Sequence, residues 1–212
     1  MKYKHIVWDW NGTLLDDLWL CVNAINYVLQ SRDMPLVTTK SYRSIFCFPV
    51  IEYYKKLGFD FTKEPFPIPG FLEYYKNKFE NCNLHQDAKI VLKKINQSGL
   101  TQSILSAGKQ SSLINWVEYH NISHFFNQLV GVDNENADGK IEAGINWIRN
   151  SLYNPENILL IGDTIHDSEV AKDMGVKCVL IPIGHVSKGR LKSTGETVLP
   201  SLKSILEYLE ID

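Results

Sequence analysis

Hydrophobic positions along the chain form two kinds of pattern, short continuous runs and stripes spaced three or four residues apart. Short apolar runs are typical of strands buried in a sheet, and we predict five, at residues 5–8, 103–105, 128–130, 158–161 and 178–181. Stripes of helical period separate most of them, such as the one formed by Ala88, Val91, Leu92 and Ile95. This alternation predicts βαβ units and an α/β fold, with a mostly parallel, Rossmann-like sheet flanked by helices.

One long segment, residues 16–83, interrupts the alternation. It opens on a stripe of helical period and continues with aromatic-rich helical patches at 51–57 and 71–79, and it contains no run typical of a strand. An all-helical block placed after the first strand of an α/β domain indicates an inserted cap. We therefore predict a core domain of residues 1–15 and 84–212 and a helical cap domain of residues 16–83.

Charge and composition exclude several classes of partner. The formal net charge is −2 at pH 7, and the basic residues are scattered, so we expect no nucleic-acid partner. No apolar run is long enough to span a bilayer, and Met1 leads almost directly into the first predicted strand without room for a signal peptide. The four cysteines form no CxxC pair, which favours reduced thiols. We expect a cytoplasmic protein without a membrane partner, as a monomer or weak homodimer.

Three of the predicted strands run directly into a side chain that can do chemistry: Asp9, Ser106 and Asp163. Ligands of an open parallel sheet bind beyond the carboxyl ends of its strands, so we expect these side chains to meet at one edge. Two carboxylates suit a magnesium ion that also holds a substrate phosphate, and a carboxylate beside it can attack phosphorus. Lys140, which precedes a helical stripe, can reach the same edge and neutralise phosphate charge.

The residues at these strand ends resemble the four motifs of the haloacid dehalogenase-like hydrolase superfamily. Asp-Trp-Asn-Gly-Thr-Leu at 9–14 is similar to the first motif, Asp-x-Asp-Gly-Thr-Leu. Ser106 matches the second motif and Lys140 the third, and Gly-Asp-Thr-Ile-His-Asp at 162–167 is similar to the fourth, Gly-Asp-Thr-x-x-Asp. The resemblance covers the whole chain, and the layout is most similar to the phosphoglycolate phosphatase group with a small helical cap.

The resemblance implies a phosphatase that hydrolyses a small phosphorylated metabolite, such as a phosphoglycolate-like monoester. Asp9 would be the nucleophile and would form an aspartyl-phosphate, while Ser106 and Lys140 would hold the transferred phosphoryl group. Asp167 would orient Lys140 or a metal-bound water. The residues implied for the Mg²⁺ site are Asp9, Asn11 through its backbone carbonyl, Asp163 and Asp167.

Asn11 departs from the family motif, which has a second aspartate at this position. In the family that side chain protonates the leaving oxygen and then activates water, and an amide cannot shuttle a proton. The resemblance therefore implies intact metal and phosphate binding with turnover lowered by about a hundred- to ten-thousandfold. His166 and Asp16 are the candidate substitutes, although the first is equally well a loop residue and the second a helix cap.

Other functions stay open. Cleavage of a carbon–phosphorus bond is known among relatives that lack the second aspartate, and it requires a cap lysine that forms a Schiff base, for which Lys55 and Lys56 are the candidates. Asn11 also favours a catalytically weak phosphate-binding or regulatory protein. Dehalogenase activity is least favoured, because the carboxylates of the fourth motif imply a metal that dehalogenases do not use.

Two further segments carry weaker signals. Arg43 lies in the predicted cap, where relatives often place substrate-contacting residues, and its guanidinium can pair with a substrate carboxylate or remain at the surface. The segment 184–187 follows the last predicted strand, and we expect it to be a loop without a chemical role.

Overall fold

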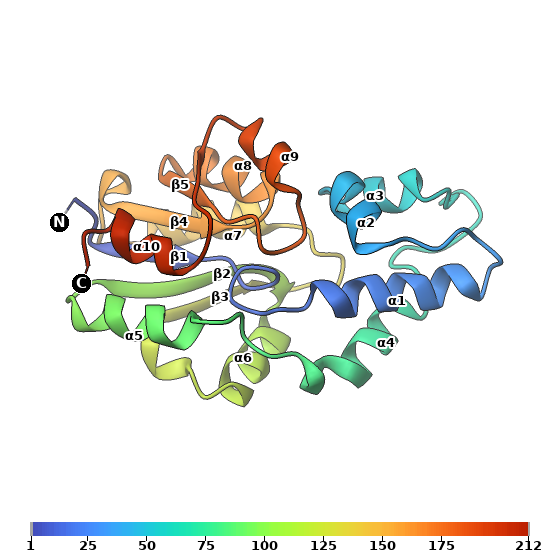
Figure 1. The fold of residues 1–212 in the computed structure, drawn as a ribbon, viewed down its shortest axis with the longest axis horizontal. Helices are drawn as coiled ribbons and strands as arrows, with labels where there is room; N and C mark the ends of the chain where they lie inside the picture. The colour runs from blue at the N-terminus through green and yellow to red at the C-terminus, as the bar shows by residue number, and fades with distance from the viewer. Residues whose placement is uncertain (1, 212) are drawn as a thin grey trace.

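The computed structural model describes residues 2–211, whose centre is a six-stranded, entirely parallel sheet (Figure 1). The strand order is β3-β2-β1-β4-β5-β6. The strands are β1 His5–Trp8, β2 Thr101–Lys109, β3 Gln128–Val132, β4 Ile158–Gly162, β5 Lys177–Leu180 and β6 Thr197–Val198. The predicted α/β, Rossmann-like fold is confirmed. The central strands β1 and β4 are buried along their whole length, which explains why they appear in the sequence as uninterrupted apolar runs.

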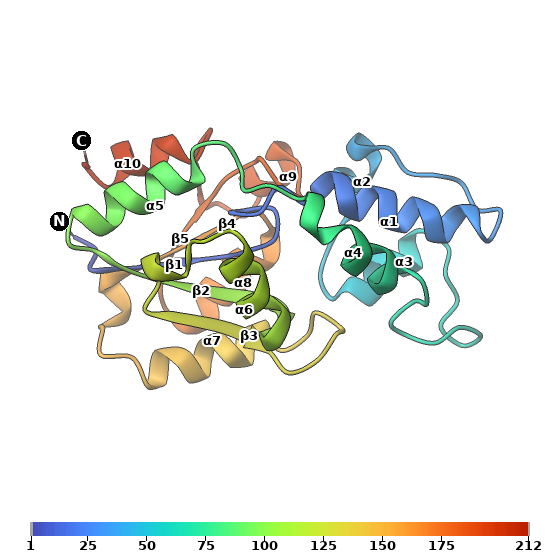
Figure 2. The same cartoon turned by 90° about the horizontal axis from the view of Figure 1, so that it is seen from below.

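Helices cover both faces of this sheet. The core helices are α5 Ala88–Gln97, α6 Gln110–Tyr119, α7 Lys140–Arg149, α8 Ile165–Met174, α9 Lys188–Lys192 and α10 Lys203–Tyr208, with 3₁₀ turns at Ser123–Phe125 and Pro155–Asn157. In Figure 2, α5 and α10 lie on one side of the sheet and α7 on the other. This follows from right-handed crossovers, because the strand order reverses direction after β3. The reversal places the ends of β1 and β4 side by side.

The predicted cap segment forms a helical lobe beyond the carboxyl ends of the strands (Figure 1). Its elements are α1 Leu18–Gln30, α2 Thr39–Ile45, α3 Val50–Lys56, α4 Phe71–Lys78 and a 3₁₀ turn at Phe79–Asn81. The stripe that predicts α1 is buried, since Leu18, Val22, Ile25 and Leu29 face the lobe interior and α1 packs on α4.

The lobe joins the core through two adjacent linkers. Leu15 and Leu84 form an antiparallel bridge, and the Asp16 N–H donates to the Asn83 carbonyl at 2.9 Å. The chain therefore leaves and re-enters the core at one place. Across the described residues, no helix has the length and apolar character needed to cross a membrane.

Candidate active site

Asp9 and Asp163 follow neighbouring strands, β1 and β4, and their carboxylates lie close together as predicted from the strand ends. Asp9 is held at the sheet by its N–H, which donates to the Ile161 carbonyl at 2.8 Å. The Thr13 hydroxyl lies 2.9 Å from Asp9 Oδ2 and 3.0 Å from Asp163 Oδ1, so its single hydrogen is shared between two carboxylates. The loop after β1 thus supplies both a carboxylate and the hydroxyl that links it to the second one.

Lys140 begins α7, and its ammonium is buried between two carboxylates. Its Nζ lies 2.6 Å from Asp9 Oδ1 and 2.6 Å from Asp167 Oδ1. Burial alone would lower the pKa of Lys140, but the adjacent Asp167 and Asp9 raise it above its ordinary value, so the side chain is a cation. For Asp167, burial acts to raise the pKa and the Lys140 ammonium outweighs it, which keeps this carboxylate ionised.

Three carboxylates are buried together here, and the Lys140 ammonium pairs with two of them, Asp9 and Asp167. Ligand oxygens of Asp9, Asp163 and Asp167 all lie within 4.8 Å of one another. Burial raises the pKa of Asp9 to about 6 against the opposing effect of Lys140, and burial together with the charges of Asp9 and Asp167 raises the pKa of Asp163 well above its ordinary value. A divalent cation would supply the missing positive charge, and an all-oxygen donor set is the kind that Mg²⁺ prefers. The residues present therefore fit the implied metal.

Ser106 lies where the pairing between β2 and β3 loses its regular register. Its buried hydroxyl oxygen accepts the Gly108 N–H at 2.9 Å. A β-carbon placed on Gly108 would lie 3.2 Å from Ser106 Oγ and 3.8 Å from Asn11 Oδ1, so Gly108 sits between these two polar side chains. The fold brings Ser106 and Asn11 to the same edge of the sheet as the carboxylates.

The loop 184–187, to which the sequence assigned no chemical role, contributes a histidine to the site. The His185 N–H donates to Asp163 Oδ2 at 2.5 Å, its Nε2 lies 3.2 Å from Asp17 Oδ1, and its Nδ1 lies 3.2 Å from the Tyr42 hydroxyl. Burial acts to lower the pKa of His185, but the Asp17 carboxylate outweighs burial and raises it to about 9. The imidazole is therefore a buried cation beside the carboxylate cluster.

Asp17 is the second residue that the sequence analysis missed. Its Oδ1 accepts the Gly12 N–H at 2.9 Å, and its Oδ2 accepts Asn11 Nδ2 at 2.8 Å and the Tyr75 hydroxyl at 2.8 Å. Burial acts to raise the pKa of Asp17, while His185 and these hydrogen bonds lower it below its ordinary value. Asp17 thereby fixes the side chain of Asn11, the residue that departs from the family motif.

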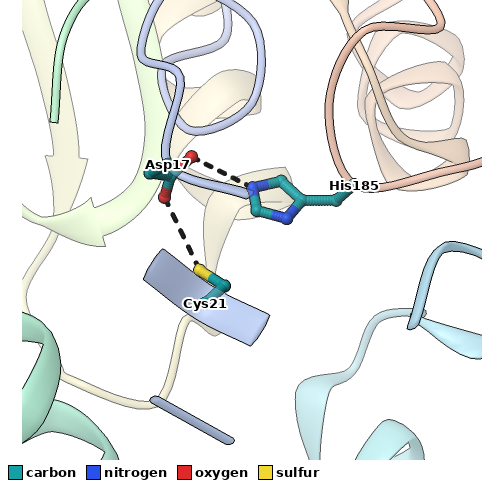
Figure 3. Close-up of side chains that lie close together, drawn as sticks. All are labelled: Asp17, Cys21 and His185. Atoms are coloured by element: carbon teal, nitrogen blue, oxygen red, sulfur yellow. Dashed lines mark hydrogen bonds and ion pairs between the residues drawn. The ribbon is translucent and has the colours of Figure 1, made fainter. Parts of the chain in front are cut away.

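Asp17 also lies between His185 and Cys21, as Figure 3 shows. Cys21 Sγ is 3.6 Å from Asp17 Oδ2, and ligand atoms of all three residues lie within 4.8 Å of one another. A metal here would have to displace the hydrogen-bond donors that already occupy both carboxylate oxygens. We interpret the cluster as a hydrogen-bond network around one buried carboxylate.

Neither predicted substitute for the missing aspartate lies at Asn11. Asp16 is exposed in the linker, and the first helix begins one residue beyond Asp17. His166 pairs with Glu169 at 3.1 Å and stacks on Phe48. The charged groups that contact Asn11 or its contact partners are instead Asp17 and His185.

The structure does not bring Arg43 to the carboxylates. Its Nη2 donates to the Pro182 carbonyl at 2.6 Å and to the Val186 carbonyl at 3.0 Å. The guanidinium therefore ties α2 to the loop that carries His185, and these carbonyls occupy donors that a substrate carboxylate would need. Its position explains how the lobe helps to hold that loop.

The lysines considered for a Schiff base also lie elsewhere. Lys55 pairs with Glu52 at 2.7 Å, Lys56 Nζ lies 3.0 Å from Cys47 Sγ, and both lysines are exposed. Of the lobe lysines in the described part of the chain, only Lys76 lines the central cavity, at its half-exposed rim. Cleavage of a carbon–phosphorus bond through a buried cap lysine is therefore not supported by this arrangement.

A cavity of about 190 Å³ lies between the helical lobe and the carboxyl edge of the sheet. Asp9, Asn11 and Lys140 line its core side, as do Asp17 and His185. The helices α2, α3 and α4 line its other side. The nucleophile candidate therefore faces a partly open cavity with the volume of a small ligand.

Comparison with known proteins identifies the class to which this fold and site belong. The sequence profile of the family described as haloacid dehalogenase-like hydrolase matches residues 6–181. The phosphoglycolate phosphatase of Aliivibrio fischeri is 21% identical over 203 residues, which cover 86% of this chain and 85% of that protein. The chain belongs to the haloacid dehalogenase-like hydrolases, which confirms the predicted family and the prediction of a hydrolase.

Solved structures of the same architecture cover nearly the whole chain. A haloacid dehalogenase-like family hydrolase from Streptococcus pneumoniae superposes with a TM-score of 0.77 at 20% identity, covering 98% of this chain and 99% of that one. Protein tyrosine kinase A (PtkA) of Mycobacterium tuberculosis superposes with a TM-score of 0.83 at 16% identity, covering 99% of both chains. At these identities the likeness shows the fold, lobe included.

Gly184 offers a test of how closely the His185 loop approaches the carboxylates. A β-carbon on Gly184 would overlap Asp163 Oδ2 and would lie 2.5 Å from the Gly12 carbonyl oxygen. We expect Gly184→Ala to displace Asp163, to lower stability by about 1–3 kcal/mol and to weaken Mg²⁺ binding. Thermal unfolding and calorimetric Mg²⁺ titration measure the two effects.

Gly189→Ala is the matched control, because nothing lies within 4 Å of a β-carbon there and the residue belongs to α9. This variant should bind Mg²⁺ like the wild type and unfold at the same or a higher temperature. Equal Mg²⁺ affinity in both variants would show that the Gly184 approach does not position Asp163.

Proposed function

We propose that the protein is a phosphatase that hydrolyses a small phosphate monoester through an aspartyl-phosphate on Asp9, with Mg²⁺ as cofactor. The observation that carries this function is the placement of Asp9. It lines the cavity, one of its oxygens is paired with Lys140 at 2.6 Å, and the Asp163 carboxylate lies beside it. The name of the Aliivibrio fischeri relative, phosphoglycolate phosphatase, supports the same reaction class.

The chain's own residues position the nucleophile and the phosphoryl group in the reaction. A carboxylate oxygen of Asp9 attacks phosphorus, the phosphorus–oxygen bond of the ester breaks, and the leaving alkoxide takes its proton from water, because the Asn11 amide cannot supply one. Water then attacks phospho-Asp9, which releases inorganic phosphate and restores the carboxylate. Lys140 and the Ser106 hydroxyl hold the phosphoryl oxygens, and Asp167 holds Lys140. Mg²⁺, held by Asp9, Asp163 and the Asn11 carbonyl, would add positive charge at the phosphate.

Asn11 limits the rate of this reaction. Its amide donates to Asp17 and lies 3.0 Å from the Tyr75 hydroxyl, and it has no proton that it can release to a leaving alkoxide. We therefore propose slow turnover with intact binding. The same residue favours the second candidate, a phosphate-binding protein with little turnover, and steady-state rates across a panel of phosphorylated metabolites separate the two.

Metal dependence gives the direct test of the Mg²⁺ assignment. Asp163→Ala removes a carboxylate from the proposed metal site, so we expect Mg²⁺ to stimulate hydrolysis of p-nitrophenyl phosphate in the wild type and not in this variant. Asp173→Ala, at an exposed position of α8, is the matched control and should keep the full stimulation. Full metal-dependent activity in Asp163→Ala would show that the metal binds elsewhere.

A further inference from the structure

We infer that the substrate's alcohol is a small aromatic group without a second negative charge, so that the enzyme acts on the phosphate monoester of a one-ring alcohol. This inference rests on the proposed function, because it places the phosphate at Asp9 and assigns the rest of the cavity to the alcohol. It differs from the phosphoglycolate of the relatives, whose alcohol carries a carboxylate.

Aromatic side chains form most of the cavity wall opposite Asp9. Nine of the 28 lining residues are Phe, Tyr or Trp, and eight of those nine come from the helical lobe. Phe48, Phe66 and Phe71 are only partly buried, as is Trp116 on the core side. Aromatic rings attract further rings in edge-to-face and offset geometry, so this wall favours a ring over an aliphatic or charged group.

The rings already make such pairs with one another around Tyr54. Its ring centroid lies 6.1 Å from that of Phe66 and 6.2 Å from that of Phe71, both in edge-on geometry. A ligand ring entering the cavity would meet exposed edges and faces of the same set. The contacts it needs are therefore of a kind that the lobe already forms.

Each cation that lines the inner part of the cavity, as far as the described residues extend, already has a carboxylate partner. Lys140 is committed to Asp9 and Asp167, and the His185 imidazole is committed to Asp17 at 3.2 Å. Lys76 and Lys109 lie at 2.7 and 3.6 Å from one carboxylate, that of Glu135, at the half-exposed rim. A second anionic group on the substrate would lose water without gaining a buried partner, which disfavours its binding.

The volume of the cavity suits an alcohol of about one ring. An apolar protein cavity of about 150 Å³ is large enough to bind benzene, whereas sites for drug-sized ligands start at about 300 Å³. The present cavity of about 190 Å³ lies between these values.

Non-hydrolysable phosphonates test the inference without relying on turnover. We would measure calorimetric affinities, with Mg²⁺ present, for 2-phenylethylphosphonate, propylphosphonate and 3-phosphonopropionate, which correspond to benzyl phosphate, ethyl phosphate and phosphoglycolate. Burial of a phenyl ring should make the first bind about tenfold to a hundredfold more tightly than the second. The carboxylate compound should bind most weakly.

Two variants locate this selectivity. Leu72→Arg places a cation in the cavity and should reverse the preference, strengthening 3-phosphonopropionate and weakening 2-phenylethylphosphonate by at least about tenfold each. Ile90→Arg, at an exposed position of α5 outside the cavity, is the matched control and should keep the wild-type order.

Each outcome separates the inference from the proposed function. Tightest binding of 3-phosphonopropionate, or equal binding of the phenyl and propyl compounds, would overturn the aromatic alcohol and leave the phosphatase standing. Failure of all three phosphonates to bind would contradict the phosphate site at Asp9 itself. The same order should appear in kcat/KM for benzyl phosphate, ethyl phosphate and phosphoglycolate, whose leaving groups are all alkoxides.

Discussion

Asp9→Asn is expected to lower the phosphatase kcat by at least about ten-thousandfold, the largest effect that we predict for a single substitution. The reason is chemical, because an amide oxygen does not form the aspartyl-phosphate and no other carboxylate of the cluster lines the cavity close to Lys140. Steady-state hydrolysis of p-nitrophenyl phosphate, with protein purified in parallel, measures the loss.

The variant should remain folded, which separates lost chemistry from lost structure. Asp9→Asn removes one ion pair with Lys140, but it also removes a negative charge from a cluster of three carboxylates. We expect the unfolding temperature to change by only a few degrees. Asp16→Asn, an exposed aspartate outside the cavity, is the control and should keep wild-type activity. Wild-type turnover in Asp9→Asn would mean direct attack by water or a contaminating enzyme.

Asn11→Asp is expected to raise the steady-state rate by roughly a hundredfold, the usual contribution of a positioned proton donor. In the wild type, the first turnover of p-nitrophenyl phosphate should be fast, because p-nitrophenolate leaves without a proton, and later turnovers should be slow, because hydrolysis of phospho-Asp9 lacks its base. The new carboxylate would lie opposite Asp17 Oδ2, where Asn11 now donates at 2.8 Å. The new carboxylate can give a proton to the leaving group and then accept one from water, which an amide cannot do.

Rapid-quench measurements of the initial burst of product and of the later steady-state rate test whether Asn11 limits turnover. The double variant Asn11→Asp, Asp17→Asn is the matched control, because it exchanges the amide and the carboxylate and keeps one of each in contact. It should retain the gain in rate with less loss of stability than the single variant. The wild-type enzyme should also hydrolyse p-nitrophenyl and acetyl phosphate faster than alkyl phosphates, by a larger rate ratio than is usual for a phosphatase. Asn11→Asp should reduce this rate ratio. An unchanged burst and steady rate would show that Asn11 does not limit turnover.

Signals that are local in the sequence allowed most of the fold to be predicted. The apolar runs of β1 and β4 are buried on both faces, so burial and sequence pattern coincide there. By contrast, β2 continues to Lys109, beyond its predicted end at residue 105. The prediction stopped there because Ser106, Ala107 and Gly108 show no pattern typical of a strand. The two-residue strand β6 is too short to produce any period at all.

Residues of the candidate site could be predicted only where a reactive side chain directly follows a strand. Asp9 and Asp163 satisfy that rule. His185 lies several residues beyond β5, and its direction depends on how the loop turns back over Asp163. Of the neighbours Asp16 and Asp17, the first is exposed in the linker, and the second, which directly precedes α1, is buried in the site. No pattern in the sequence distinguishes those two carboxylates.

The place of Asp17 couples motion of the helical lobe to the integrity of the site. Asp17 stands at the point where the paired linkers give way to α1, yet it binds Gly12 and His185 of the core. A swing of the lobe about those linkers that carried α1 with it would pull this carboxylate away from both. The hydrogen bonds that align Asn11 would break in the same step. Opening for product release and dismantling of the site would thus be a single event, and closure over the next substrate would rebuild it.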